Sequence, residues 1–270
     1  MATSLPREGS KRGSLWDQRK DGSVSTTEES IDLEQANEEL LSLSSEDRIR
    51  WAIDQFGLQA VLLSSMQKTA SAMMHLFHRL NLENEILFVD TGFHFHETLQ
   101  VRDEFMRRYH LNVMTLYPKK TPEDQERLYG RKLYLFVDGQ PECCRLRKEV
   151  PFIDHVKQKG HRLVMLGLRQ GEGGKRKNVQ PISVDPRFDG YVMYPILDWT
   201  TERLESYLAE HDVPIHPLHA ENYPSIGCAP CTTPVAPGED PRAGRWRHLR
   251  EAEGEGPKYC GINFVDGSGI

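Results

Sequence analysis

Short apolar segments alternate with helical segments along this chain, and this alternation restricts its fold more than any other feature. Apolar runs typical of buried strands occur at 60–65, 85–90, 112–117 and 161–167. Apolar residues recur at helical spacing in 68–80, 96–109 and 199–212. We expect another helix in the segment CCRLRKEVPFIDHVKQK. The alternation predicts an α/β fold, with a mostly parallel twisted sheet and helices on both faces. Ligands of such sheets bind beyond the carboxyl ends of the strands.

The two ends of the chain differ in composition from its middle. Residues 1–30 are polar and rich in Ser, Thr and Glu, and we expect them to be disordered. The main domain is expected to span residues 31–250 and to begin with helices, the second capped by Ser44 or Ser45. Its last part is dense in Pro and Gly. Residues 251–270 are expected to form a mobile tail.

The composition limits the class of protein. The chain has 270 residues and a net charge of −6, which argues against a general nucleic-acid binder. Its apolar runs are shorter than the ~20 residues of a membrane span, and its N-terminus lacks the apolar core of a secretory signal. We therefore expect a cytoplasmic protein with no nucleic-acid or membrane partner. Because a reducing cytosol disfavours stable disulfides, the five cysteines need another explanation.

Four of the cysteines form two pairs. Cys143 and Cys144 are adjacent, and a disulfide between neighbours would be strained because their Cα atoms lie only about 3.8 Å apart. Cys228 and Cys231 form a CxxC motif, and four thiolates suit zinc or an iron–sulfur cluster. Adjacent cysteines fit one tetrahedral ion poorly but can bind separate iron atoms of a cubane. This favours one [4Fe–4S] cluster, with zinc and unrelated structural thiols as the alternatives.

Basic residues follow the adjacent cysteines. Arg145, Arg147 and Lys148 would offset the negative charge of a thiolate-bound cluster. If this segment is helical, Lys148 lies on nearly the same face as the cysteine pair. The alternative is an ordinary solvated basic face.

The fifth cysteine, Cys260, lies ten residues from the end in the glycine-rich stretch GEGPKYCGINFVDGSGI. The nearby Lys258 would lower the pKa of the thiol and raise its thiolate fraction. The residue is therefore either a nucleophile on a mobile arm or an incidental exposed cysteine.

Arginines and hydroxyl groups occur where an anion would bind. Arg169 follows a predicted strand end, and Arg242 and Arg245 are three apart in EDPRAGRWR. Guanidinium groups suit the oxygens of phosphate and sulfate. Ser64 and Ser65 fall at a strand-to-helix turn, where hydroxyls and free N–H groups can hold phosphate.

At this point the sequence resembles the assimilatory adenylyl-sulfate reductases of the phosphoadenylyl-sulfate reductase superfamily. The resemblance covers roughly residues 35–263, and its motifs are VDTG, CCRLRK, PILDWT, YPSIGCAPCTTPVAPGEDPRAGRW and CG. It implies an adenine nucleotide α-hydrolase-like fold. The branch that carries both cysteine pairs uses adenylyl sulfate, whereas the branch without them prefers the 3′-phosphorylated nucleotide.

The resemblance also implies roles for individual residues. The cluster ligands would be Cys143, Cys144, Cys228 and Cys231. The residues near the phosphosulfate or the cluster would be Lys148, Arg169, Arg242 and Arg245. The remaining expected substrate-binding residues are Ser64, Ser65, Asp90, Thr91 and Gly92.

The implied reaction is the reduction of adenylyl sulfate to sulfite and AMP, with Cys260 as nucleophile and thioredoxin or a glutaredoxin-type protein as reductant. Homo-oligomerisation stays open. The sequence departs from the family pattern where Tyr259 and Asn263 replace a Glu and a His around Cys260. The first loop lacks the usual Gly and acids, and one arginine is missing next to Arg169. Two alternatives to this function remain. The protein could be a phosphoadenylyl-sulfate or dual-substrate reductase, or it could be a non-enzymatic nucleotide-binding cluster or zinc sensor.

Overall fold

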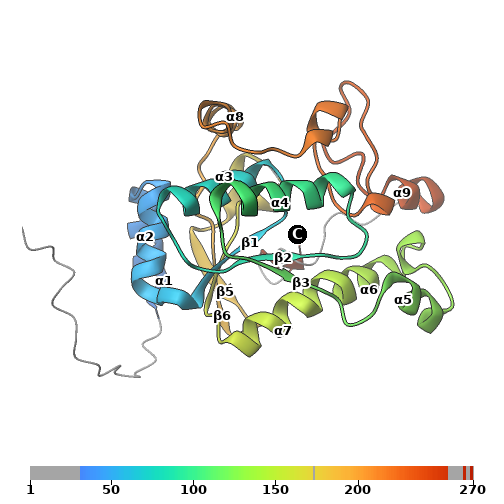
Figure 1. Cartoon of the computed structure of the whole chain (residues 1–270), viewed down its shortest axis with the longest axis horizontal. Coiled ribbons are helices and arrows are strands. Elements are labelled where there is room, and N and C mark those ends of the chain that lie inside the picture. The colour runs from blue at the N-terminus through green and yellow to red at the C-terminus, as the bar shows by residue number, and fades with distance from the viewer. Residues whose placement is uncertain (1–30, 173, 255–263, 266–267, 270) are drawn as a thin grey trace, which may run out of the picture. The chain divides into compact units, whose positions relative to one another are not determined.

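The computed structural model describes residues 31–172, 174–254, 264–265 and 268–269. The secondary structure described below lies in one compact unit, Leu33–Ile270. A central sheet carries helices on its two faces (Figure 1). The predicted α/β class is therefore confirmed.

The central sheet has six strands in the order β3-β2-β1-β4-β6-β5. Their bounds are β1 Ala60–Ser64, β2 Ile86–Val89, β3 Val113–Leu116, β4 Leu163–Met165, β5 Ile182–Asp185 and β6 Gly190–Met193. All neighbouring pairs are parallel except β5 and β6, which are antiparallel. In the register, Leu62 pairs with Ile86 on one side and with Met165 on the other. The two short strands β7 (Phe264–Val265) and β8 (Ser268–Gly269) form a separate antiparallel pair.

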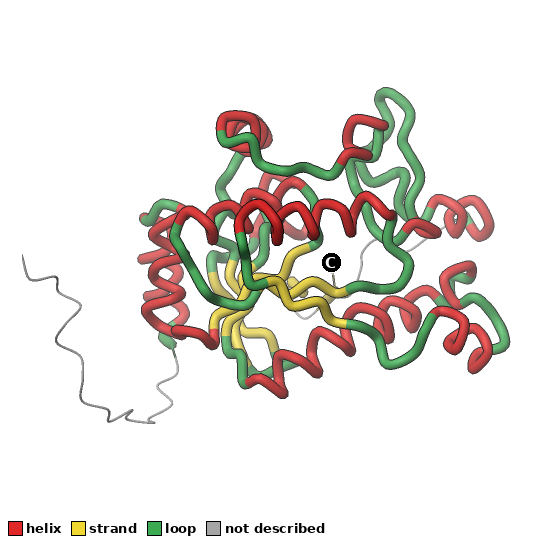
Figure 2. The backbone as a smooth tube through the Cα atoms, viewed as in Figure 1, coloured by secondary structure: helices red, strands yellow, loops and turns green. Residues whose placement is uncertain are grey.

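Helices connect the strands. Their bounds are α1 Leu33–Ser42, α2 Ser45–Phe56, α3 Lys68–Arg79, α4 His96–Tyr109, α5 Pro122–Tyr129, α6 Gln140–Cys144, α7 Val150–Lys159, α8 Thr201–Glu210 and α9 Arg247–Glu253. Helices α3 and α4 lie on one face of the sheet and α7 on the other (Figures 1 and 2). None of the helices in the described part of the chain is long and apolar enough to span a bilayer.

Polar caps fix where several helices begin. Ser44 accepts a hydrogen bond from the backbone N–H of Asp47, so the serine cap expected at Ser44 or Ser45 falls on Ser44. Thr121 and Thr200 cap α5 and α8 in the same way. The core between the sheet and α7 is built from β-branched and large apolar side chains, among them Val61, Leu87 and Phe152.

The sequence analysis missed several elements, among them β5, β6, α5 and α9. The strands β5 and β6 have only four residues each, and β5 is a partly exposed edge strand without a continuous apolar run. The helix α5 follows its cap with acidic residues and buries only Gln125, so it lacks an apolar stripe. These elements escape detection because periodicity depends on a buried face that recurs over several residues.

Candidate active site

The four paired cysteines gather around one cavity. Cys143 and Cys144 end α6, whereas Cys228 and Cys231 flank a short 3₁₀ turn far along the chain. The other residues that line this cavity are Phe93, Tyr134, Gln140, Arg147, Lys148, Pro230 and Trp246. None of these four cysteines is in a disulfide.

Backbone hydrogen bonds hold the CxxC loop against the sheet edge. The N–H of Ala229 donates to the carbonyl of Phe93 over 2.7 Å, just beyond the end of β2. The N–H of Trp246 donates to the carbonyl of Cys231 over 2.9 Å, and the Trp246 side chain is buried. The loop that carries the CxxC and the later arginines is therefore one packed unit at the carboxyl edge.

A π-helical turn separates the cysteine pair from α7. Residues Arg145–Glu149 form this turn between α6 and α7, and the N–H of Val150 donates to the carbonyl of Arg145, five residues back. Such turns are rare and widen a helix by one residue. The turn directs Arg147 into the protein and leaves Lys148 on the cavity wall.

Arg147 is the buried cation beside the cysteines. Its guanidinium donates to the carbonyls of Thr91 and Lys120 and to the side chain of Gln125, and it lies 5.0 Å from the centre of the Phe93 ring. Burial lowers its pKa, although the nearby thiols of Cys143 and Cys228 act in the opposite direction.

The expectation for Arg145 was wrong. Its guanidinium forms an exposed ion pair with Glu142 at 2.7 Å instead of facing the cysteines. The two residues are three positions apart on one helical face, which brings their side chains together. Of the three basic residues that follow the cysteine pair, Arg147 and Lys148 line the cavity.

Neutral side chains donate hydrogen bonds to the cysteine sulfurs. The amide of Gln140 lies 2.9 Å from the sulfur of Cys144, and that of Gln125 lies 3.6 Å from the sulfur of Cys143. The hydroxyl of Thr91 is 3.4 Å from the sulfur of Cys228. Sequence reasoning missed both glutamines. Gln140 could have been found, because it precedes Cys144 by one helical turn.

Burial keeps two of the cysteines protonated. It raises the pKa of Cys143 and raises that of Cys231 to about 12. These thiols are therefore poor nucleophiles at neutral pH. Binding a metal would require and stabilise the thiolate form, so this set suits metal ligation better than free thiol chemistry.

No three of the four cysteine sulfurs lie within 4.8 Å of one another. In the described part of the chain, only Glu85, His155 and His161 place three potential ligand atoms within 4.8 Å of one another. A zinc ion about 2.3 Å from each thiolate would hold the sulfurs about 3.8 Å apart.

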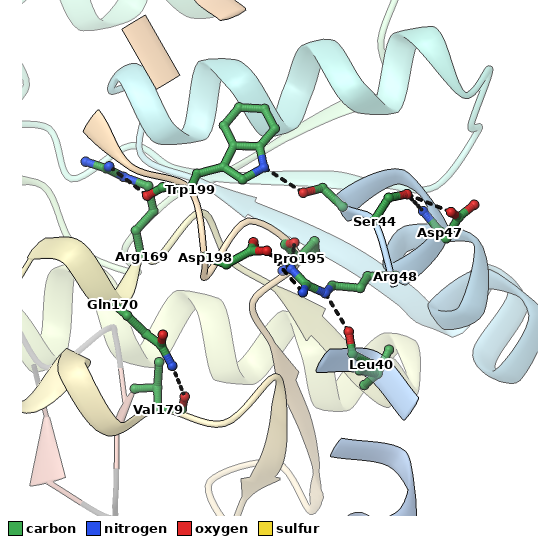
Figure 3. Close-up of polar contacts among 11 residues, drawn as sticks. Leu40, Ser44, Asp47, Arg48, Arg169, Gln170, Val179, Pro195, Asp198 and Trp199 are labelled. Carbon is green, nitrogen blue, oxygen red and sulfur yellow. Dashed lines mark hydrogen bonds and ion pairs between the residues drawn. The ribbon is translucent and has the colours of Figure 1, made fainter. Parts of the chain in front are cut away.

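Two arginines of the predicted anion site are buried. Arg169 donates from Nη1 to the carbonyl of Trp199 over 3.1 Å (Figure 3), and its Nε lies 3.6 Å from Glu172. Arg245 donates to the carbonyl of Ile226 over 3.3 Å. Within the described residues, the Nε atoms of both arginines are buried without a hydrogen-bond partner. Each guanidinium thus keeps donor capacity for a ligand.

An ion pair between the buried Arg48 and the half-exposed Asp198 fixes the segment that orients Arg169. Arg48 in α2 donates to the carbonyl of Pro195 over 3.0 Å and to the carboxylate of Asp198 over 2.7 Å (Figure 3). The indole N–H of Trp199 donates to Ser45 over 2.6 Å. The motif PILDWT therefore holds the carbonyl that binds Arg169.

The strand-end residues take different environments. Ser64 is buried and its hydroxyl lies 3.1 Å from the sulfur of Met74, whereas Ser65 is exposed. Asp90 accepts a hydrogen bond from the N–H of Gly92, which closes the turn after β2. Gly92 has φ 71°, and a Cβ there would lie 3.0 Å from Nη2 of Arg147. The turn therefore needs glycine.

The remaining predicted residues lie elsewhere. Arg242 is partly buried, and its N–H donates to Asp240 over 2.7 Å. The predicted nucleophile Cys260 lies outside the described residues, as do Tyr259 and Asn263.

The fold and the site define a nucleotide α-hydrolase-like α/β protein that carries a four-cysteine cavity and buried arginines. The chain belongs to the family of the phosphoadenosine phosphosulfate reductase domain, whose model matches residues 59–234. This confirms the family resemblance inferred from the motifs.

Relatives span nearly the whole chain. The adenosine 5′-phosphosulfate reductase of Mycolicibacterium smegmatis is 36% identical over 90% of this chain and 98% of its own length. The protein of the same name from Streptomyces coelicolor is 37% identical over 88% of this chain and 96% of its own length. The crystal structure of phosphoadenylyl-sulfate reductase from Candida auris covers 78% of this chain and all of that chain, with a TM-score of 0.67 and 22% identity. The similarity to the Candida auris structure shows that the two chains share a fold.

Proposed function

We propose that this protein reduces adenylyl sulfate to sulfite and AMP in sulfate assimilation. One observation carries the proposal: both cysteine pairs, which imply adenylyl sulfate as substrate, line a single cavity together with Lys148. The relatives named for adenosine 5′-phosphosulfate match almost the whole chain and support the same substrate.

The proposed chemistry uses Cys260 as nucleophile. Its thiolate attacks the sulfur of adenylyl sulfate, the bond from sulfur to the bridging oxygen breaks, and AMP leaves with the electron pair. The product is an S-sulfocysteine. A thiolate of thioredoxin or a glutaredoxin-type protein then attacks the Cys260 sulfur and releases sulfite, and its second thiol resolves the mixed disulfide. The two electrons come from the partner dithiol.

Cationic residues would stabilise the charge on the phosphosulfate. The buried guanidinium groups of Arg169 and Arg245 are pre-positioned by backbone carbonyls. Within the described residues, the Nε of Arg245 makes no hydrogen bond, and that of Arg169 lies 3.6 Å from Glu172. Such fixed donors in a partly dry site cost little reorganisation. We assign Lys148 to the wall between the cysteines and the substrate, and Arg242 to the loop that precedes Arg245.

We further propose that the four cysteines hold one [4Fe–4S] cluster. The donor set is all sulfur and largely buried, and the adjacent Cys143 and Cys144 suit separate iron atoms better than one tetrahedral ion. A bound cluster would supply a fixed local charge, and Arg147 and Lys148 would balance it. The reaction itself needs only the substrate, Cys260 and the partner dithiol.

The decisive experiment is anaerobic purification of the full chain, followed by its visible spectrum and iron content. Sulfite release is then measured with reduced thioredoxin, and adenylyl sulfate and its 3′-phosphorylated form compete at equal concentration. We expect iron–sulfur absorption and a strong preference for adenylyl sulfate. A preference for the phosphorylated nucleotide, or no sulfite from either, would overturn the proposal.

Two cysteine variants, one at Cys260 and one at Cys231, make the test specific. Cys260→Ser should abolish sulfite release and leave the visible spectrum unchanged, because the hydroxyl cannot form the S-sulfocysteine. Cys231→Ser should instead lower the iron content. Substantial turnover by Cys260→Ser would refute its role as nucleophile.

A further inference from the structure

Three ligand-type side chains meet at the edge of the sheet opposite the cysteine cavity. Glu85 immediately precedes β2, His155 lies in α7 and His161 lies two residues before β4. The residues therefore belong to the amino ends of two parallel strands and to the helix that covers them. The site described above uses the carboxyl ends.

The three side chains converge on one point. The Nε2 atoms of His155 and His161 each lie 3.0 Å from the same carboxylate oxygen, Oε2 of Glu85. All three ligand atoms lie within 4.8 Å of one another. A zinc ion about 2.0–2.1 Å from nitrogen and oxygen ligands spaces those ligands about 3.3 Å apart. Small side-chain rotations would therefore make room for one ion.

The three side chains are shielded from solvent. Burial raises the pKa of Glu85, but the hydrogen bonds from His155 and His161 outweigh it and lower the pKa. The side chains are only 8–21% exposed, which limits competition by water.

We propose that Glu85, His155 and His161 form a binding site for one Zn²⁺ ion, separate from the cysteine centre. Two imidazoles and one carboxylate are a ligand set that zinc takes in proteins, with water in the fourth position. The ion would join the start of β2, the helix α7 and the segment that leads into β4. Its role would be structural, because no predicted substrate residue belongs to this edge.

The test compares zinc and iron content in the same samples. Anaerobically purified full-length protein is equilibrated with Zn²⁺, dialysed, and analysed for both metals per chain. Wild type should retain one equivalent of zinc more than Glu85→Gln or His155→Gln, with equal iron in all three. Equal zinc in wild type and both variants would show a hydrogen-bonded cluster without a metal and would overturn the proposal.

Matched control variants and a second measurement distinguish loss of the zinc site from misfolding of a variant. Glu83→Gln and His96→Gln change exposed residues of the same types and should retain the extra zinc. Zinc at about 100 times its Kd should raise the Tm of wild type by roughly 5 °C, and should not raise that of Glu85→Gln. Equal Tm shifts in wild type and this variant would also refute the site.

Discussion

The side-chain amide of Gln140 donates a hydrogen bond to the sulfur of Cys144 over 2.9 Å. The amide comes from one helical turn earlier in α6, so the cysteine and its donor are part of the same short helix. Gln125 approaches Cys143 from a different helix. Each of the adjacent cysteines thus has its own neutral donor.

Replacing Gln140 by Leu should make the midpoint potential of the proposed cluster more negative. A hydrogen bond to a ligand sulfur stabilises the more negative, reduced state, and its net contribution of about 1 kcal/mol corresponds to roughly 40 mV. Potentiometric titration followed by electron paramagnetic resonance measures the shift. Gln158→Leu, an exposed change in α7, serves as the control and should leave the potential unchanged. Equal potentials for Gln140→Leu and wild type would contradict the role of this hydrogen bond.

Gly227→Ala should impair substrate binding with little effect on stability. An added Cβ would collide with the guanidinium of Arg245, which must then leave its position beside the carbonyl of Ile226. Loss of one oriented charge contact of about 1.5–3 kcal/mol lowers kcat/KM roughly 10- to 100-fold. Steady-state sulfite release measures the effect. Gly171→Ala meets no atom within 4 Å and should behave as wild type.

Arg48→Ala should destabilise the fold by about 3 kcal/mol. The change leaves the carbonyls of Leu40 and Pro195 without their donor and removes the partner of Asp198. Urea unfolding measures the loss. Arg50→Ala breaks an exposed pair and should cost below about 0.5 kcal/mol, so similar losses for the two variants would argue against the buried network.

Stability should fall as the pH drops from about 6.5 to about 4, in part because of His75. Burial lowers the pKa of His75 from 6.5 to about 4, with the charges of His211 and His78 acting in the same direction. The unfolded chain therefore binds a proton in this window that the folded chain does not, and ΔG of unfolding decreases toward acid. Thermal unfolding at pH 4 to 7 should show a shallower pH dependence for His75→Gln than for wild type. The exposed His96→Gln is the control, and an unchanged slope in His75→Gln would contradict the assignment.

The regular elements were predictable where a buried face repeats over several turns. The helix α4 has the bounds 96–109 that its spacing indicated. The edge strand β5 was not found, because it is partly exposed and has neither a continuous apolar run nor a regular alternation of buried and exposed residues. That the two cysteine pairs would meet was predicted only from the chemistry of four thiols, which suits a shared metal centre. No local sequence pattern connects segments so far apart.

The arrangement around the cysteines was only partly predictable. The sequence placed three cations after the pair, but the π-helical turn decides that Arg147 points inward and Arg145 outward. Gln125 comes from α5, a helix without an apolar stripe, so its contact with Cys143 had no sequence signal. Such contacts depend on tertiary packing rather than on spacing along the chain.

The wide turn at Arg145–Glu149 makes this segment sensitive to length rather than to composition. Removing any one of its five residues would restore ordinary α-helical winding and rotate everything before it by about 100° relative to α7. The sulfurs of Cys143 and Cys144 would then swing away from Cys228 and Cys231, although every cysteine would still be present. A homologue that keeps all four cysteines but has a one-residue gap here would therefore have lost the geometry of the centre, which a comparison of motifs alone would overlook.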